Sequence, residues 1–154
     1  MTEEKTTGTL TSILTSAHPE QLGDFLEENK ESLIRSDRPF AAFMRERIRA
    51  KGLKQQDVFL AADISEGYGY KLISEEKHTR QRDVILRLCL AAGFSFKEAQ
   101  KALKLNGMTP LYAKIPRDSV FIIALNNGIR DTGRVDGMLA EYGFEPLYIC
   151  TQEE

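Results

Sequence analysis

The stretch "LKQQDVFLAADISEGYGYKL", residues 53–72, has the layout of two short helices around a tight turn. Its second half carries two glycines, Gly67 and Gly69. A glycine inside a helix costs up to about 1 kcal/mol relative to alanine. A strand, a loop or a weakened helix must therefore be considered for residues 65–74 beside the helical interpretation.

Helix signals continue on both sides of this stretch. Before it, "SDRPFAAFMRERIRAKG" places apolar residues at helical spacing and ends at Gly52. The exposed face of this helix is expected to carry Arg45, Arg47, Arg49 and Lys51. After it, "QRDVILRLCLAAG" and "SFKEAQKALKLNG" both predict helices, and Ser95 with Glu98 predicts a capping box.

The last part of the chain repeats what precedes it. "RDVILRLCLAAG", from Arg82, matches "RDSVFIIALNNG", from Arg117, at an offset of 35, and the segments ending at Tyr112 and Tyr148 match at an offset of 36. The pattern predicts two successive helix-turn-helix hairpins, each stacking on its neighbour to cover its apolar face. Because two copies are fewer than a free-standing array requires, the hairpin of residues 108–149 should pack on the first.

The composition excludes several classes of protein. At 154 residues the chain can bury a core without disulfides, and Cys89, in an apolar run, is interpreted as a core residue. Two histidines and no close Cys/His cluster make a metal site improbable. The N-terminus does not have the pattern of a secretory signal, and no stretch approaches a membrane span, so we expect a cytoplasmic protein.

Catalysis finds little support in the sequence. No Gly-rich phosphate loop precedes a helix, and no Ser-His-Asp set stands out. Paired carboxylates such as Glu27 and Glu28 are explained as hydrated surface. We therefore expect no enzymatic activity, no catalytic residue and no cofactor.

Charge is segregated along the chain although the net charge is only −2. Residues 1–37 carry three bases and eight acids, residues 38–104 fourteen bases and eight acids, and residues 105–154 four bases and seven acids. A basic segment between acidic flanks is what a local polyanion site would leave in a sequence. An ordinary charged surface is the alternative.

Together these patterns predict an all-α protein with four segments. Residues 1–18 are expected to be a flexible tail, and residues 19–37 an acidic helical arm that begins at Pro19. Residues 38–107 are expected to form the basic helical domain on which the terminal hairpin packs.

The segment "MRERIRAKGLKQQDVFLAADISEGYGYKLI", followed by "RDVILRLCLAAG", resembles the five-helix DNA-binding domain of phage-repressor-like, XRE-type helix-turn-helix regulators. The resemblance covers about residues 39–106, and the span to Leu147 looks like a longer form that ends in a further hairpin. The positions that agree are Leu53, Gln55, Val58, Ile64, Ser65 and Leu72. The resemblance implies that residues 55–62 form the first helix of the motif and residues 65–74 the recognition helix.

The resemblance also implies which residues contact DNA. Gln55 should bind a phosphate, with Gln56 beside it, and the start of the recognition helix should face the major groove. The "KHTRQR" segment after it should add phosphate contacts. The full set of implied contacts is Gln55, Gln56, Ser65, Glu66, Tyr68, Tyr70, Lys71, Lys77, Arg80 and Arg82.

The sequence departs from the family pattern at five positions. Lys54 replaces the usual capping Ser or Thr, and Phe59 replaces an alanine that allows close helix packing. Asp63 stands where glycine usually makes the turn, and Asp tolerates the left-handed conformation better than most residues. Gly69 takes a position that is normally apolar and buried, and Glu75 replaces the glycine that closes the recognition helix.

Two functions follow as expectations. The first is sequence-specific binding of duplex DNA by a bacterial or phage-type transcriptional regulator, for which a homodimer is the natural form, with Tyr68 and Tyr70 projecting from the recognition helix. The alternative is an adapter that keeps the repressor-like fold but recognises a regulatory protein partner through these tyrosines or the terminal hairpin. Neither involves a membrane.

Overall fold

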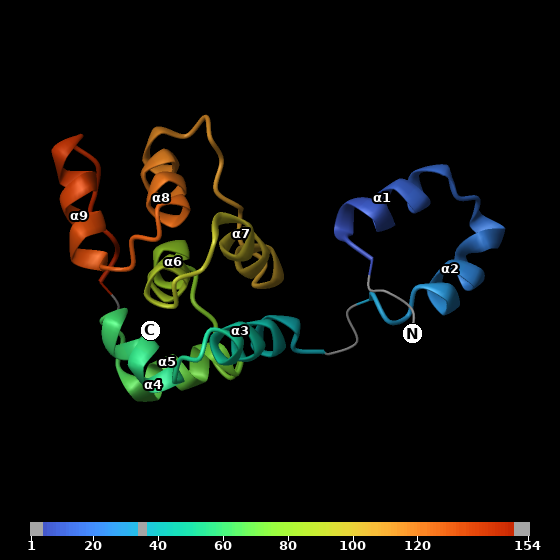
Figure 1. The fold of residues 1–154 in the computed structure, drawn as a ribbon, viewed down its shortest axis with the longest axis horizontal. Helices are drawn as coiled ribbons and strands as arrows, with labels where there is room; N and C mark the ends of the chain where they lie inside the picture. Colours follow the sequence, from blue (N-terminus) through green and yellow to red (C-terminus); the bar gives the residue numbers. More distant parts are fainter. Residues whose placement is uncertain (1–4, 34–36, 150–154) are drawn as a thin grey trace. The chain divides into compact units, whose positions relative to one another are not determined.

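The structure is a computed structural model that describes residues 5–33 and 37–149. These residues form nine α-helices and one short 3-10 helix, and they contain no strand (Figure 1). The predicted all-α class is confirmed. Parts of the predicted tail and arm, residues 1–4 and 34–36, and Cys150 lie outside the described residues.

The chain divides into two compact units, residues 1–37 and 38–154. The smaller unit contains α1 (Thr7–Ser16), a 3-10 turn (Pro19–Gln21) and α2 (Leu22–Glu28). Helix α1 thus lies within residues 1–18, the segment predicted to be a flexible tail, and the flexibility itself stays a prediction. The Thr6 hydroxyl accepts the Thr9 N–H at 3.2 Å, so a side-chain cap starts α1 in a segment with little apolar periodicity.

The larger unit contains the remaining helices. These are α3 (Pro39–Ala50), α4 (Gln55–Ala61), α5 (Glu66–Ile73), α6 (Arg82–Ala91), α7 (Phe96–Leu105), α8 (Pro116–Asn126) and α9 (Thr132–Glu141). Every residue of α6 from Val84 to Ala91 is buried, Cys89 among them. A helix that is covered on all sides is the centre of a core, and α4, α7 and α9 all pack against α6.

Helix ends follow the sequence signals closely. The Ser95 hydroxyl accepts the Glu98 N–H at 3.1 Å and the Glu98 carboxylate accepts the Ser95 N–H at 2.9 Å, which confirms the capping box. Asp63 and Glu75 take the left-handed conformation at φ 58° and 62°, as expected of the glycines they replace in the family pattern. The Glu75 carboxylate accepts the Ala41 N–H at 3.2 Å, so it caps the first turn of α3 and offsets part of the strain.

Residues 65–74 are helical over Glu66–Ile73, which rules out the strand and loop alternatives. Gly69 is required by a neighbour: a Cβ atom there would lie 2.5 Å from the Phe59 ring, which is 1% exposed. The two unusual residues therefore compensate for each other, a large ring on α4 fitting against a residue without a side chain on α5. A Cβ atom at Gly67 would meet nothing within 4 Å.

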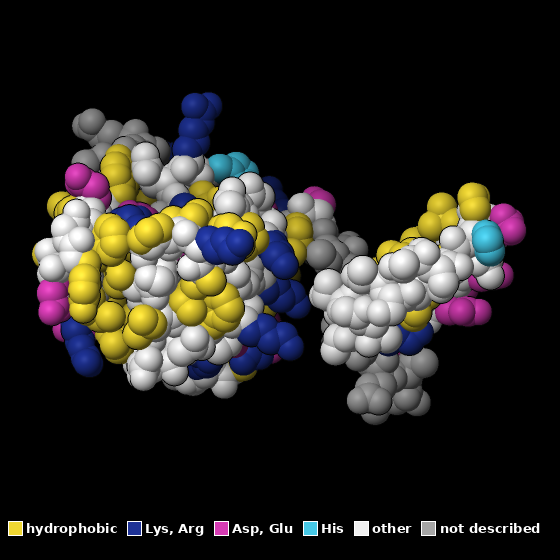
Figure 2. Space-filling model, turned by 90° about the horizontal axis from the view of Figure 1, so that it is seen from above, with side chains coloured by type: hydrophobic (Ala, Val, Ile, Leu, Met, Phe, Trp, Pro, Cys, Tyr) yellow, Lys and Arg dark blue, Asp and Glu magenta, His cyan; other side chains and the backbone are white. Residues whose placement is uncertain are grey.

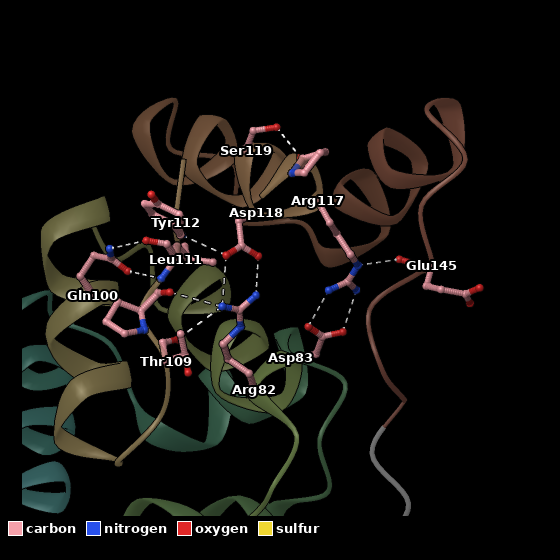
Figure 3. Close-up of polar contacts among 12 residues, drawn as sticks. Arg82, Asp83, Gln100, Thr109, Leu111, Tyr112, Arg117, Asp118, Ser119 and Glu145 are labelled. Carbon is pink, nitrogen blue, oxygen red and sulfur yellow. Dashed lines mark hydrogen bonds and ion pairs between the residues drawn. The ribbon is translucent and has the colours of Figure 1, made fainter. Parts of the chain in front are cut away.

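The two repeated hairpins, α6–α7 and α8–α9, exchange equivalent contacts (Figure 3). Arg82 pairs with Asp118, and Arg117 pairs with Asp83 at 2.8 Å. α8 packs on α7 and α9 packs on α6. When residue i of one unit contacts j of the other and j contacts i, the units are related by an approximate two-fold axis. The second hairpin thus packs on the first, as predicted, and the exchanged contacts show that the two hairpins face each other.

The extended segments that end each repeat take part in the same exchange. The N–H of Tyr112 donates to Asp118 and the N–H of Tyr148 donates to Asp83, both at 3.0 Å. The N–H of Leu111 donates to the Gln100 side chain, as that of Leu147 does to Asp136. The guanidinium of each repeat's arginine also donates to backbone carbonyls of the extended segment that ends the same repeat. Arg82 binds the carbonyls of Thr109 and Pro110, and Arg117 binds those of Glu145 and Pro146. Side chains therefore satisfy backbone groups that no strand or helix covers.

Candidate nucleic-acid interface

Helix α5 presents one exposed and one buried face. The exposed residues recur at helical spacing and are Glu66, Gly67, Tyr70 and Lys71. The buried residues are Tyr68, Gly69, Leu72 and Ile73. The exposed face thus combines an acid, a base, a phenol and a stretch of bare backbone.

Tyr68 does not belong to the exposed face. Its side chain is 5% exposed and is part of the hydrophobic core. The prediction that it projects outward to the major groove is wrong, because Tyr68 lies one turn before Leu72 on the face that packs inward. That spacing was visible in the sequence.

Tyr70 does project outward, with 42% of its surface exposed. The Phe59 ring meets it edge-on, with the ring centroids 4.9 Å apart and the planes at 83°. Phe59 in turn rests against Gly69. The glycine therefore sets the place of Phe59, and Phe59 limits the orientation of Tyr70.

A groove of about 630 Å³ runs between α3 and Tyr70. Its lining residues are Ala42, Arg45, Glu46, Arg49, Leu53, Lys54, Gln55 and Tyr70. The groove brings the half-buried Gln55, at the start of α4, next to three exposed bases. Of these, Arg45 and Arg49 were expected on the exposed face of α3, whereas Lys54 was considered only as a departure from the usual cap.

A second hollow lies on the other side of α5, lined by Ser65, Gly67, Tyr68, Lys71 and Lys77. Ser65 is the residue before the first turn of α5, and its backbone is extended there. At the start of α4, the Gln56 side chain donates to the Glu66 carboxylate at 3.5 Å. Arg80 is exposed in the loop after α5. The structure therefore places Ser65, Glu66, Tyr70 and Lys71 on or next to α5, with Lys77 in the hollow beside it, whereas Arg80 lines another hollow together with Arg82.

Arg82 is committed to other contacts. Its guanidinium forms two hydrogen bonds with Asp118 and also donates to the carbonyls of Thr109 and Pro110. A phosphate contact would have to compete with these bonds, and the predicted role of Arg82 stays a prediction. Its partner lies 36 residues ahead and becomes a neighbour only when the hairpins close, so the local sequence did not reveal the pair.

Two of the four bases expected on the exposed face of α3 also have intrachain partners. Arg47 lies 2.5 Å and Lys51 2.9 Å from the Glu98 carboxylate on α7. Burial alone would raise the pKa of Glu98, but the Ser95 backbone N–H and the Lys51 and Arg47 cations lower it to about 2. These bases tie α3 to α7 instead of lining the groove.

The described residues offer no sign of a metal site, a membrane span or a reactive thiol. There, no group of three His, Cys, Asp or Glu side chains could hold a metal ion. No helix in residues 5–33 or 37–149 is long and apolar enough to cross a membrane. Burial raises the pKa of the Cys89 thiol, which leaves it protonated and unreactive at neutral pH.

Comparison with known proteins adds no assignment. No protein family matches the chain, and no curated protein or solved structure matches it either. The functional proposal therefore rests on the residues and their geometry.

Proposed function

We propose that the protein is a cytoplasmic, sequence-specific duplex DNA-binding regulator of transcription, of the bacterial or phage type, in which α5 enters the major groove. In this proposal residues 38–107 form a five-helix, repressor-like domain, α4 and α5 are its helix-turn-helix pair, and the chain binds as a homodimer. The observation that carries the proposal is the exposed face of α5, which lies between the basic groove and the lysine-lined hollow. A helix face with cations on both sides matches a major groove bordered by two phosphate strands.

The residues divide between phosphate and base contacts. Gln55, at the start of α4, and the bases flanking α5 would position the protein on phosphates. Those bases are Arg45, Arg49, Lys54, Lys71, Lys77 and Arg80. Tyr70 would contact a base edge, and Glu66 can accept a hydrogen bond from the amino group of cytosine.

Gly67 supports a close approach at this face. It is exposed, and among the described residues no atom lies within 4 Å of the place where its Cβ would be. Glycine in a helix weakens the helix, so a residue of this kind on an outward face fits a partner that approaches the backbone closely.

The direct test compares two triple variants with equal charge change. Replacing Lys71, Lys77 and Arg80 by alanine should weaken duplex binding by at least tenfold and lower the slope of log K against log salt by about 2 to 3. The control replaces Lys104, Lys114 and Arg134, which are exposed on α7, the loop before α8, and α9. Equal affinity of both variants in a fluorescence anisotropy titration would contradict the assigned face.

The alternative is a protein-interaction adapter, and exposed hydrophobic residues favour it. Leu60 on α4 is 81% exposed. Figure 2 shows hydrophobic side chains between Lys and Arg on the face toward α7, α8 and α9. Exposed large hydrophobics in that part of the chain are Tyr112, Ile115, Ile123 and Tyr142. Apolar surface marks protein interfaces, and binding through it should depend little on salt, unlike binding to DNA.

A further inference from the structure

Arg87 lies in the middle of α6 and is 4% exposed. Its guanidinium donates to three backbone carbonyls: Nε to Tyr148 at 2.8 Å, Nη2 to Leu147 at 3.2 Å and Nη1 to Ala62 at 3.4 Å. Two of the carbonyls belong to residues 145–149, which we call the C-terminal strap. The third ends α4. One buried cation thus joins the end of the described chain to the turn before α5.

Arg87 is not explained by the symmetry of the hairpins. The ion pairs and the bonds to the two extended segments occur twice, at offsets of 35 or 36. The residue 35 positions after Arg87 is Ile122, and the carbonyl of Leu111, equivalent to that of Leu147, accepts from Gln100 instead. Closing the hairpins therefore does not require an arginine at position 87.

The carbonyl of Ala62 belongs to the same peptide group as the N–H of Asp63, the residue with φ 58°. The turn is closed by the bonds from Asp63 N–H to Leu60 and from Ile64 N–H to Phe59. This turn sets the direction in which α5 leaves α4. A cation at the C-terminal end of α4 stabilises the carbonyls that the helix itself leaves unpaired.

We propose that Arg87 is a positioning residue for DNA recognition, through which the docked C-terminal strap holds the α4–α5 turn and thereby fixes the exposed face of α5. The proposal rests on the DNA-binding function proposed above. When the strap is in place, the buried guanidinium has its carbonyl partners on both sides. When the strap leaves, two of these three bonds are lost inside the protein, which is costly for a buried charge. The strap and the turn are therefore coupled energetically.

The test replaces Arg87 by methionine, which keeps an unbranched apolar side chain and removes all three donors. The matched control is Arg130→Met. Arg130 also donates to a backbone carbonyl, that of Ala91, at 2.6 and 3.1 Å. This carbonyl lies at the C-terminal end of α6 and touches neither the strap nor the α4–α5 turn. Amide hydrogen exchange of Asp63 and Ile64 is measured in the whole protein, and duplex affinity is measured at a temperature where all variants are folded.

Arg87→Met should speed the exchange of the Asp63 and Ile64 amides about tenfold relative to the α6 amides and weaken duplex binding about tenfold. Arg130→Met should change neither. If Arg87→Met does not fold, Arg87→Lys is used. Lysine keeps the positive charge, but its ammonium group cannot reach the strap and the turn at once as the planar guanidinium does. Unchanged exchange at Asp63 and Ile64 in the folded variant overturns the proposal. The exchange measurement needs no DNA, so a wild-type protein that binds no duplex refutes the proposed function without deciding the coupling.

Discussion

Gly67 and Gly69 lie two positions apart on α5 and have different reasons to be glycine. Gly69 makes room for the Phe59 ring, whereas Gly67 faces outward with nothing near its missing side chain. The sequence showed both as weak points of a helix but not that one had a partner on α4. That fit depends on the angle between α4 and α5, which a pattern along the chain does not specify.

Alanine substitutions should separate these two roles. Gly69→Ala should lower the free energy of unfolding by about 1–3 kcal/mol, because the methyl group overlaps the Phe59 ring in a packed core. Gly67→Ala should raise it by up to about 1 kcal/mol, because it removes a helix-weakening residue without a clash. Urea denaturation of both variants decides this, and a Gly69→Ala protein as stable as the wild type would contradict the packing described here.

Some positions with a local signal were predicted and Tyr68 was not, whereas no position with a distant partner was predicted. Asp63 takes the left-handed conformation that its place in the turn implied, and Glu75 takes it too, which was not predicted. Tyr68 was misplaced although its one-turn distance from Leu72 shows its buried side. Arg82 could not have been placed from its neighbours, because Asp118 reaches it only through the packing of α8.

At the scale of elements, Glu98 links α3 to α7, and its titration should make the free energy of unfolding fall at acid pH. Its folded pKa of about 2 lies below the usual 4.5, so its contribution is present above pH 4.5 and is lost as the pH falls toward 2. The loss should be on the order of 3 kcal/mol. Glu98→Gln should be less stable than the wild type at pH 7, with a difference that shrinks toward pH 2. A constant difference in urea midpoints over this range would show that the ion pairs with Arg47 and Lys51 contribute little.

The two reciprocal ion pairs, Arg82–Asp118 and Arg117–Asp83, should contribute unequally to the free energy of unfolding. The Asp118 side chain is 1% exposed and that of Asp83 is 14% exposed. Asp118→Ala should therefore lower the free energy of unfolding by about 3–5 kcal/mol, and Asp83→Ala by less, because each leaves an arginine without its carboxylate. Asp131→Ala serves as the control, since it removes only an exposed cap of α9 and should cost about 1 kcal/mol. If urea titrations show that Asp118→Ala lowers the free energy of unfolding no more than Asp131→Ala does, the stabilising role of the reciprocal ion pairs is contradicted.

At the scale of the whole molecule, the repeat predicted two hairpins and the packing of the second on the first, but not the symmetry that relates them. The matching segments predicted the helices, and the shared Arg-Asp pairs were visible in both copies. Whether two copies stack by translation or face each other across a two-fold axis depends on which residues meet across the interface. Only the exchanged contacts of Arg82 with Asp118 and of Arg117 with Asp83 decide it.

The central claim is that the exposed face of α5 and its flanking bases form a surface for duplex DNA. The most direct measurement selects from random duplexes and then titrates the best sequence and a scrambled one at two salt concentrations. We predict at least 1,000-fold tighter binding of the selected duplex and a loss of about 0.9 logarithmic units in affinity per phosphate contact for each tenfold rise in salt. Equal, weak binding of both duplexes would contradict the claim and favour a protein partner.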